Sequence, residues 1–226
     1  MIPLVIYGTG GHAREVLTLV QSANAVATQF ELLGFVDDDP VKHGSTVKGL
    51  SVVGIEEAVS WDSSLEVVVA IGHTPTRYRV AQRLAELGVG SPALVHPHAL
   101  VGTEVILGPG VQIAAGVAIT TDVRIGHHVI VNQGCTIAHD AILHDFVTLA
   151  PGVRVSGNVH VGEGSDIGTG TAIIQGVRIG EWSVVGAGAA VVRDLPPNVT
   201  AVGVPARVIK TRPAGWHQAP SGNLLR

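Results

Sequence analysis

His139 and Asp140 are neighbours in the sequence, and together they offer two side chains that could move a proton. An imidazole titrates near neutrality, so it can take a proton from an amine that is about to attack a carbonyl carbon. The adjacent carboxylate could orient the ring and stabilise its charged form. The chain has 11 histidines, and a solvated turn histidine is the alternative interpretation of His139.

A glycine turn near the N-terminus could hold phosphate. Gly8-x-Gly10-x-x-Ala13 follows an apolar segment and opens a helix-compatible one, and Asp37 lies 24 residues beyond Ala13. Glycine lets the backbone approach a diphosphate at a helix N-terminus. A Cβ at Gly10 would block that approach, and it would also strain the turn if Gly10 has a positive φ. The same residues are also compatible with an ordinary tight strand–helix turn.

A second apolar segment ends in glycine, at Ala70-Ile71-Gly72. In a parallel sheet this turn would reach the same carboxyl edge as the first, where ligands of such folds bind. The N-terminal region is short for a whole dinucleotide, so a nucleoside diphosphate is the better fit.

Most of the remaining chain is a six-residue repeat, which must position His139. An aliphatic residue stands at every sixth position through 17 hexads, and the fifth position is usually small or β-branched. This period fits short strands that end in turns and wind into a solenoid with three hexads per coil. At strand spacing, a little under six coils make a prism about 27 Å tall. The first positions are Val95, Val101, Leu107, Ile113, Ile119, Ile125, Val131, Ile137, Leu143, Leu149, Val155, Val161, Ile167, Ile173, Ile179, Val185 and Val191.

The repeat places His139 at the third position of its hexad, where a strand meets a turn and the side chain points outward. Gly157 stands 18 residues later, and therefore directly below it. A glycine below an outward histidine leaves a notch that a small group carrying a carbonyl could fill. Gly157-Asn158 would offer a backbone N–H to the carbonyl oxygen as charge builds there. Cys135 has an inward fifth position, which indicates a small core residue more than a nucleophile.

Residues 1–94 have a different pattern, in which apolar strands alternate with helix-compatible stretches. The expected strands are 4–7, 32–36, 50–53 and 67–71, and the expected helices are 12–26, 55–59 and 76–87. This alternation predicts an α/β, Rossmann-like domain with a small parallel sheet. We therefore divide the chain into this domain (1–94), an all-β solenoid (95–209) and a Pro/Gly-rich tail (210–226).

Composition excludes several classes of protein. The 226 residues carry a net charge of −4, which argues against general nucleic-acid binding. No run of 18 apolar residues occurs, so no membrane span is expected, and the first residues lack the basic flank and cleavage site of a signal peptide. A single cysteine agrees with a reducing compartment, so we expect a cytoplasmic protein.

Four motifs occur in a fixed order: Gly-x-Gly-Gly-His-Ala-Arg-Glu at 8–15, Gly-Phe-Val-Asp-Asp-Asp-Pro at 34–40, Ala-Ile-Gly at 70–72, and Gly-Val-Pro-Ala-Arg at 203–207 after the hexads. In this combination the chain, to about residue 209, resembles a family of bacterial sugar acetyltransferases. That family includes the sialic acid O-acetyltransferases and the bacillosamine- and perosamine-type N-acetyltransferases. The resemblance implies a left-handed parallel β-helix, a nucleotide-sugar site in the N-terminal domain, and acetyl-CoA bound at a subunit boundary of a homotrimer.

The resemblance also assigns roles to residues. His139 and Asp140 match the family's catalytic histidine and the acid that follows it. The nucleotide-sugar site would comprise Gly8, Gly10, Gly11, His12, Asp37, Asp38, Ile71, Gly72 and His73. Acetyl-CoA would contact Asn132, Thr148, Gly157, Asn158, Gly168, Thr169, Gly170, Ala187, Gly188, Pro205, Ala206 and Arg207. This chain departs from the family at Thr148, where many members carry a further histidine, and at His73, where Asn or Asp is common.

The sequence therefore predicts an acetyl-CoA-dependent N-acetyltransferase for surface glycan biosynthesis. It would act on the amino group of a UDP- or GDP-linked 4-amino-4,6-dideoxyhexose, with direct attack on the thioester and no metal. An O-acetyltransferase of sialic acid or another sugar is the alternative within the class. A γ-type carbonic anhydrase would need three histidines converging across subunits, and the column of His139 has Thr121 above and Gly157 below. A non-catalytic scaffold that binds sugar nucleotides is the last alternative.

Overall fold

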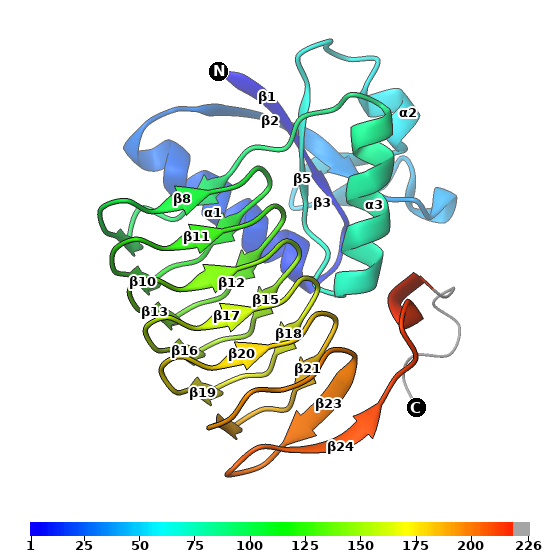
Figure 1. The fold of residues 1–226 in the computed structure, drawn as a ribbon. Coiled ribbons are helices and arrows are strands. Elements are labelled where there is room, and N and C mark those ends of the chain that lie inside the picture. The colour runs from blue at the N-terminus through cyan, green and yellow to red at the C-terminus, as the bar shows by residue number, and fades with distance from the viewer. Residues whose placement is uncertain (219–226) are drawn as a thin grey trace.

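The computed structural model describes residues 1–218, which form two domains in contact with each other. Figure 1 shows the α/β domain against one side of a tall stack of short strands, with the C-terminal segment returning beneath helix α3 (Thr74–Glu86). Within residues 1–218, no helix is long and apolar enough to cross a membrane.

The N-terminal domain contains a five-stranded sheet in the order β3-β4-β2-β1-β5. Neighbouring strands are parallel, except that β3 and β4 form an antiparallel hairpin. Its elements are β1 (Ile2–Tyr7), α1 (Gly11–Val26), β2 (Phe30–Val36), the 3-10 turn η1 (Pro40–Lys42), β3 (Thr46–Val47), β4 (Leu50–Val53), α2 (Ile55–Ala58), β5 (Glu66–Val69) and α3. The expected strands and helices are confirmed, whereas the two-residue β3 and the 3-10 turn η1 were not predicted.

Helices cover both faces of this sheet, which explains why its central strands are almost entirely apolar. On one face, Leu4 and Ile6 of β1 pack against Val16 of α1. On the other face, Val5 packs in a separate cluster with Val80 of α3. The parallel order brings the carboxyl ends of β1, β2 and β5 to one edge, next to the start of α1.

The second domain is the predicted left-handed parallel β-helix. Its strands are β6 (Leu94–Val95), β7 (Leu100–Val101), β8 (Ile106–Leu107), β9 (Gln112–Ile113), β10 (Ala118–Ile119), β11 (Arg124–Ile125), β12 (Ile130–Val131), β13 (Thr136–Ile137), β14 (Ile142–Leu143), β15 (Thr148–Leu149), β16 (Arg154–Val155), β17 (His160–Val161), β18 (Asp166–Ile167), β19 (Ala172–Ile173), β20 (Arg178–Ile179), β21 (Val184–Val185), β22 (Ala190–Val191), β23 (Val199–Val202) and β24 (Arg207–Thr211). Through β22 the strands pair in parallel 18 residues apart, as when Ile119 pairs with Val101 and with Ile137. This register confirms the coil of three hexads.

Small aliphatic side chains fill most of the interior of the prism, and Ser165, Thr171 and Ser183 occupy three of the buried fifth positions. Ile137 at a first position and Cys135 at a fifth position are both 0% exposed. Burial raises the pKa of the Cys135 thiol to about 11, so it stays protonated at neutral pH. The interpretation of Cys135 as a core residue is confirmed.

Three turns in each coil form three edges of the prism. The glycine edge follows the strands that lie beneath the N-terminal domain, and its turns are 96–99, 114–117, 132–135, 150–153, 168–171 and 186–189. The histidine edge, which contains His139, has the turns 102–105, 120–123, 138–141, 156–159 and 174–177. The aromatic edge has the turns 108–111, 126–129, 144–147, 162–165 and 180–183.

Aromatic contacts join α3 to the aromatic edge. Tyr78 meets Phe146 and Trp182 edge-on, with ring centroids 5.1 and 5.5 Å apart. His128 stacks on Phe146 with 5.4 Å between the ring centroids. These contacts hold the outer helix of the α/β domain on the solenoid.

The predicted tail also belongs to this boundary, because β24 crosses the expected border at residue 209 and the chain then returns toward α3. The Trp216 indole N–H donates to the Trp182 carbonyl oxygen at 3.2 Å. His217, in the 3-10 turn η2 (Trp216–Gln218), stacks on Trp182 with centroids 3.5 Å apart. The part of the tail at 219–226 lies outside the described residues.

The buried His128 gives the domain boundary a dependence on pH. Burial, with a smaller effect of the Arg77 charge, lowers its pKa to about 4. The unfolded chain therefore binds more protons than the folded chain between about pH 4 and pH 6.5. The free energy of unfolding should fall as the pH drops through this window, by at most about 1.4 kcal/mol per pH unit for this one group.

We predict that His128→Asn will flatten this pH dependence. Asparagine tolerates the left-handed backbone at this position, where φ is 53°, and it does not titrate. Urea denaturation at pH 7 and pH 5 should show a smaller loss of stability on acidification than in the wild type. The other histidines are present in both proteins, so equal losses would contradict the assignment to His128.

Candidate active site

The glycine turn and the second glycine-ended strand meet in one cavity, as predicted. It has a volume of about 390 Å³ and lies at the carboxyl ends of β1, β2 and β5. Its lining includes eight of the nine residues predicted to bind the nucleotide sugar: Gly8, Gly10, Gly11, His12, Asp37, Asp38, Ile71 and Gly72. The ninth, His73, precedes α3, and its ring Nδ1 lies 2.8 Å from the Thr76 hydroxyl.

Two glycines of the turn serve different purposes. Gly8 has φ +110°, and a Cβ there would lie 3.0 Å from the Ala70 carbonyl oxygen. Gly10 has φ −75°, so the positive φ that would have made a side chain there strained is absent, and the unusual backbone belongs to Gly8. A Cβ on Gly10 would meet nothing within 4 Å. Gly10 therefore keeps the cavity open at the N-terminus of α1, where backbone N–H groups favour an anion.

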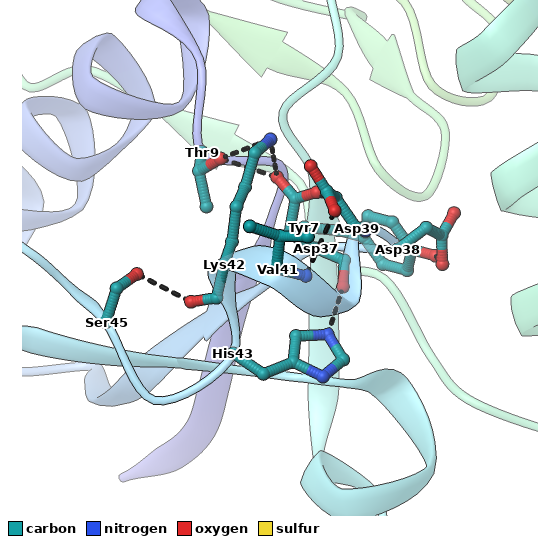
Figure 2. Close-up of polar contacts among 9 residues, drawn as sticks. All are labelled: Tyr7, Thr9, Asp37, Asp38, Asp39, Val41, Lys42, His43 and Ser45. Atoms are coloured by element: carbon teal, nitrogen blue, oxygen red, sulfur yellow. Dashed lines mark hydrogen bonds and ion pairs between the residues drawn. The ribbon is translucent and has the colours of Figure 1, made fainter.

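Figure 2 shows the polar cluster at the acidic end of this cavity. Asp37 accepts hydrogen bonds from the Thr9 hydroxyl at 2.5 Å and from the Lys42 ammonium at 2.8 Å. Partial burial opposes ionisation of Asp37, but the hydrogen bonds from Lys42 and Thr9 prevail and lower its pKa. Tyr7 donates to Asp38 at 2.5 Å. Both carboxylates are thus fixed in place by neighbours before any ligand binds.

Sequence reasoning missed Thr9 and Lys42 as members of this cluster. Lys42 ends η1, which Asp39 caps by accepting from the Val41 N–H at 3.0 Å. An Asp-Pro pair is a recognised helix-start signal, and it could have located this turn. Lys42 brings a positive charge beside Asp37, next to a cavity whose backbone favours phosphate.

A second cavity, of about 180 Å³, lies between α1 and the glycine edge, and His12 lines both cavities. Its walls are mainly apolar and include Val16 and Leu19 from α1, and it reaches Asn132 on the β-helix. The His12 ring is fixed at both nitrogens, because Nε2 lies 2.9 Å from Gln112 Oε1 and Nδ1 lies 3.3 Å from Glu15 Oε2. His12 therefore stands between the first cavity and the glycine edge.

His139 and Asp140 form the predicted pair on the histidine edge. His139 Nδ1 lies 2.8 Å from Asp140 Oδ2, and both side chains are more than half exposed. Asp140 adopts a left-handed backbone with φ 59°, which turns its carboxylate toward the ring. Among residues 1–218, the Nε2 atom has no hydrogen-bond partner, so it is available to a ligand.

Gly157 lies directly beneath His139, as predicted. A Cβ on Gly157 would lie 2.5 Å from the His139 ring, so the glycine makes the space in which the ring rests. The Asn158 N–H donates to the His139 carbonyl oxygen at 2.8 Å and is not available to a ligand. The Gly157 N–H has no acceptor within residues 1–218, so of the predicted pair only Gly157 has an N–H that a ligand could use.

The predicted acetyl-CoA residues do not lie together in one chain. Gly157 and Asn158 share the histidine edge with His139, whereas Asn132, Gly168, Thr169, Gly170, Ala187 and Gly188 follow the glycine edge. Pro205, Ala206 and Arg207 lie below the glycine edge, where the Ala206 N–H donates to the Ala190 carbonyl oxygen at 2.8 Å. The two groups occupy different edges, so a second copy of the chain is needed to bring them together.

Thr148 lies on neither edge. Its side chain faces the N-terminal domain, where its hydroxyl accepts from Arg77 at 2.7 Å, and the residue is 7% exposed. The expected contact between Thr148 and acetyl-CoA does not fit this position, because α3 covers the strand that carries it. Arg77, which lies in the expected helix 76–87, is 0% exposed.

Comparison with known proteins identifies the family. Residues 3–84 match the family described as PglD N-terminal domain. The GDP-perosamine N-acetyltransferase of Escherichia coli O157:H7 is 32% identical over 167 residues, which are 73% of this chain and 74% of that protein.

Two solved structures are similar over almost the full length. PerB from Caulobacter crescentus, in complex with CoA and GDP-perosamine, is 37% identical with a TM-score of 0.82, over 91% of this chain and 96% of PerB. The acetyltransferase domain of PglB from Neisseria gonorrhoeae FA1090, in complex with acetyl coenzyme A, is 32% identical with a TM-score of 0.81, over 92% and 99%. The chain therefore belongs to the bacterial sugar acetyltransferase family that joins a PglD-type N-terminal domain to a left-handed β-helix.

Proposed function

We propose that this protein transfers the acetyl group of acetyl-CoA to the amino group of a nucleotide-linked amino-deoxysugar, of the UDP- or GDP-linked 4-amino-4,6-dideoxyhexose type. One observation carries the proposal: a cavity with phosphate-ready backbone shares His12 as a lining residue with a mainly apolar cavity that reaches the β-helix. A diphosphate suits the first cavity and a sugar with few hydroxyls suits the second. The relatives solved with GDP-perosamine and with acetyl coenzyme A support this division.

In the proposed mechanism His139 is the general base. Asp140 holds Nδ1, so Nε2 takes the proton that the amine must lose as its nitrogen attacks the thioester carbonyl carbon. The Gly157 N–H donates to the carbonyl oxygen while negative charge develops on it. The tetrahedral intermediate then expels CoA as the thiolate and leaves the N-acetyl sugar. Asp140 stabilises the imidazolium that His139 becomes.

The proposed working unit is a homotrimer with acetyl-CoA between neighbouring chains. The histidine edge of one copy would supply His139 and Gly157, and the glycine edge of the next would supply Asn132 and the small residues below it. Small residues leave room for a pantetheine arm along that edge. The reaction would serve surface glycan biosynthesis in the cytoplasm, a setting in which the unpaired Cys135 would remain reduced.

The alternative within this class is O-acetylation of a free sugar such as sialic acid. A free sugar would leave the glycine turn and the Lys42–Asp37 cluster without a role, which favours the nucleotide-linked substrate. A non-catalytic binding protein would have no use for the His139–Asp140 pair above an open glycine. The family membership likewise favours acyl transfer over carbonic anhydrase chemistry.

An assay of CoA release over a panel of acceptors tests the proposal. The panel contains UDP- and GDP-linked 4-amino-4,6-dideoxyhexoses, the matching 4-hydroxy sugar nucleotides, and free sialic acid. We expect turnover with an amino sugar nucleotide, and a loss of at least about 100-fold in His139→Ala, the usual scale of general-base help. Turnover with sialic acid alone would replace the proposal by the O-acetyltransferase, and an unimpaired His139→Ala would remove His139 from the mechanism.

Gly157→Ala tests the position of the histidine ring without removing the base. The new Cβ would meet the His139 ring at 2.5 Å, and an exposed ring can swing away without disturbing the fold. We expect the melting temperature to stay within a few degrees of wild type, while kcat falls by about 10- to 100-fold because the base is misplaced. Gln175→Ala, one coil lower on the same edge, is the matched control, and an equal loss in both variants would contradict the interpretation.

Mixed oligomers test the shared site. His139→Ala subunits keep an intact nucleotide cavity, and Gly10→Val subunits keep an intact His139, because a Cβ branch at Gly10 obstructs only the phosphate approach. After subunit exchange, verified by mass spectrometry, the mixture should recover part of the activity that each variant lacks. Full exchange without recovery would mean that each site lies within one chain.

A further inference from the structure

Arg77 is a fully buried cation between the two domains, and the mechanism above does not use it. It lies in α3 and is 0% exposed, although charged residues are almost never buried to this extent without a partner. Within residues 1–218, no carboxylate lies within hydrogen-bond distance of its guanidinium group. Its acceptors are neutral oxygens, which come from both domains.

On the N-terminal side, Arg77 holds the second glycine-ended turn. Its Nη1 atom donates to the carbonyl oxygens of Ile71 and Gly72 at 2.9 and 3.2 Å. Both residues line the nucleotide cavity. The backbone of the cavity wall is thus fixed by a side chain that lies behind it.

On the β-helix side, Arg77 reaches two consecutive coils. Nε donates to the His128 carbonyl oxygen at 3.1 Å, and Nη2 donates to the Phe146 carbonyl oxygen at 2.8 Å and to the Thr148 hydroxyl at 2.7 Å. Phe146 and Thr148 belong to the same coil as His139, since that coil runs through β13, β14 and β15. One side chain therefore connects the wall of the nucleotide cavity to the coil that carries the base.

The charge of Arg77 is retained in this setting. Burial lowers its pKa to about 10, and the nearby Asp166 carboxylate partly opposes that effect, so the group is protonated at neutral pH. Hydrogen bonds from a charged donor are roughly twice as strong as neutral ones. A shorter or neutral side chain would leave several buried carbonyl oxygens without donors.

We propose that Arg77 is a positioning residue for acetyl transfer. It holds the nucleotide cavity at the same level along the β-helix axis as the coil that carries His139. This inference rests on the proposed function. In a ring of identical copies around an axis parallel to the prism, equivalent coils lie at the same height. Arg77 would thus align the acceptor amine of one chain with His139 of the next, and an error of about 1 Å in such alignment can cost about 100-fold in rate.

Arg77→Lys and Thr148→Val test the proposal through kcat and KM. Lysine at position 77 keeps the charge, but it lacks the planar guanidinium group whose several N–H groups bond to both domains. Valine at position 148 removes one acceptor of Arg77 and keeps the shape of the side chain. We expect Arg77→Lys to lower kcat for the amino sugar nucleotide by about 10- to 100-fold. The KM for acetyl-CoA should stay within about twofold, because that site is remote from Arg77. Thr148→Val should give a smaller loss in the same direction, and Thr148→Ser should restore most of it.

Tyr78→Leu is the control for general loosening of the boundary. It removes the contacts of α3 with Phe146 and Trp182 but leaves the bonds to Ile71 and Gly72. Folded Arg77→Lys protein with wild-type kcat would overturn the proposal. So would an equal loss of kcat in Tyr78→Leu at the same melting temperature, because Arg77 would then act only through stability. If Arg77→Lys does not fold, Thr148→Val decides: unchanged kcat overturns the proposal.

Hydrogen exchange of the unliganded protein separates this inference from the proposed function. Peptides covering residues 70–76 should exchange faster in Arg77→Lys than in the wild type or in Tyr78→Leu, and unchanged exchange would overturn the role of Arg77. This measurement needs no substrate. If the wild type acetylates no amino sugar nucleotide, the proposed function fails, whereas the exchange result still decides whether Arg77 holds the cavity wall.

Discussion

The narrow interior of the prism constrains everything else in this protein. Its first hexad positions are filled by aliphatic side chains and its fifth positions mainly by small aliphatic ones, packed in register every 18 residues. The buried hydroxyls of Ser165, Thr171 and Ser183 donate to backbone carbonyl oxygens of the prism itself, so chemistry is confined to the three edges and the outer faces. The regular register then decides which residues stand above one another, and this is why the His139 ring rests in the space that Gly157 leaves.

Each edge has a distinct use because its turns carry different residues. The histidine edge presents His139 above Gly157, while the last two turns of the glycine edge, 168–171 and 186–189, contain only Gly, Ala and Thr. The aromatic edge binds α3 and the C-terminal segment through Phe146 and Trp182. The histidine edge and the glycine edge of one straight prism cannot come into contact with each other. A site that uses residues of both edges therefore needs a neighbouring copy of the chain.

The α/β domain supplies the pocket that the prism lacks. Its sheet brings two glycine-ended strands to one edge, and Asp37 in the cavity there is held by Lys42 beside it. Fixed polar groups reduce the reorganisation that binding would otherwise require. The buried Arg77 then ties this cavity to the solenoid through carbonyl oxygens and a hydroxyl, which orients the domain without an ion pair.

The sequence by itself determined the β-helix, the 18-residue register, the pairing of His139 with Gly157, and the meeting of the two glycine turns. These features follow from local periodicity and from the order of strands along the chain, and both can be read directly from the sequence. The tertiary structure decided the rest: the positive φ of Gly8, the position of Thr148 beneath α3, and the burial of Arg77. It also decided that His12 meets Gln112, 100 residues away. Such contacts depend on how two domains dock, and neither domain's periodicity encodes the shape of the other's surface.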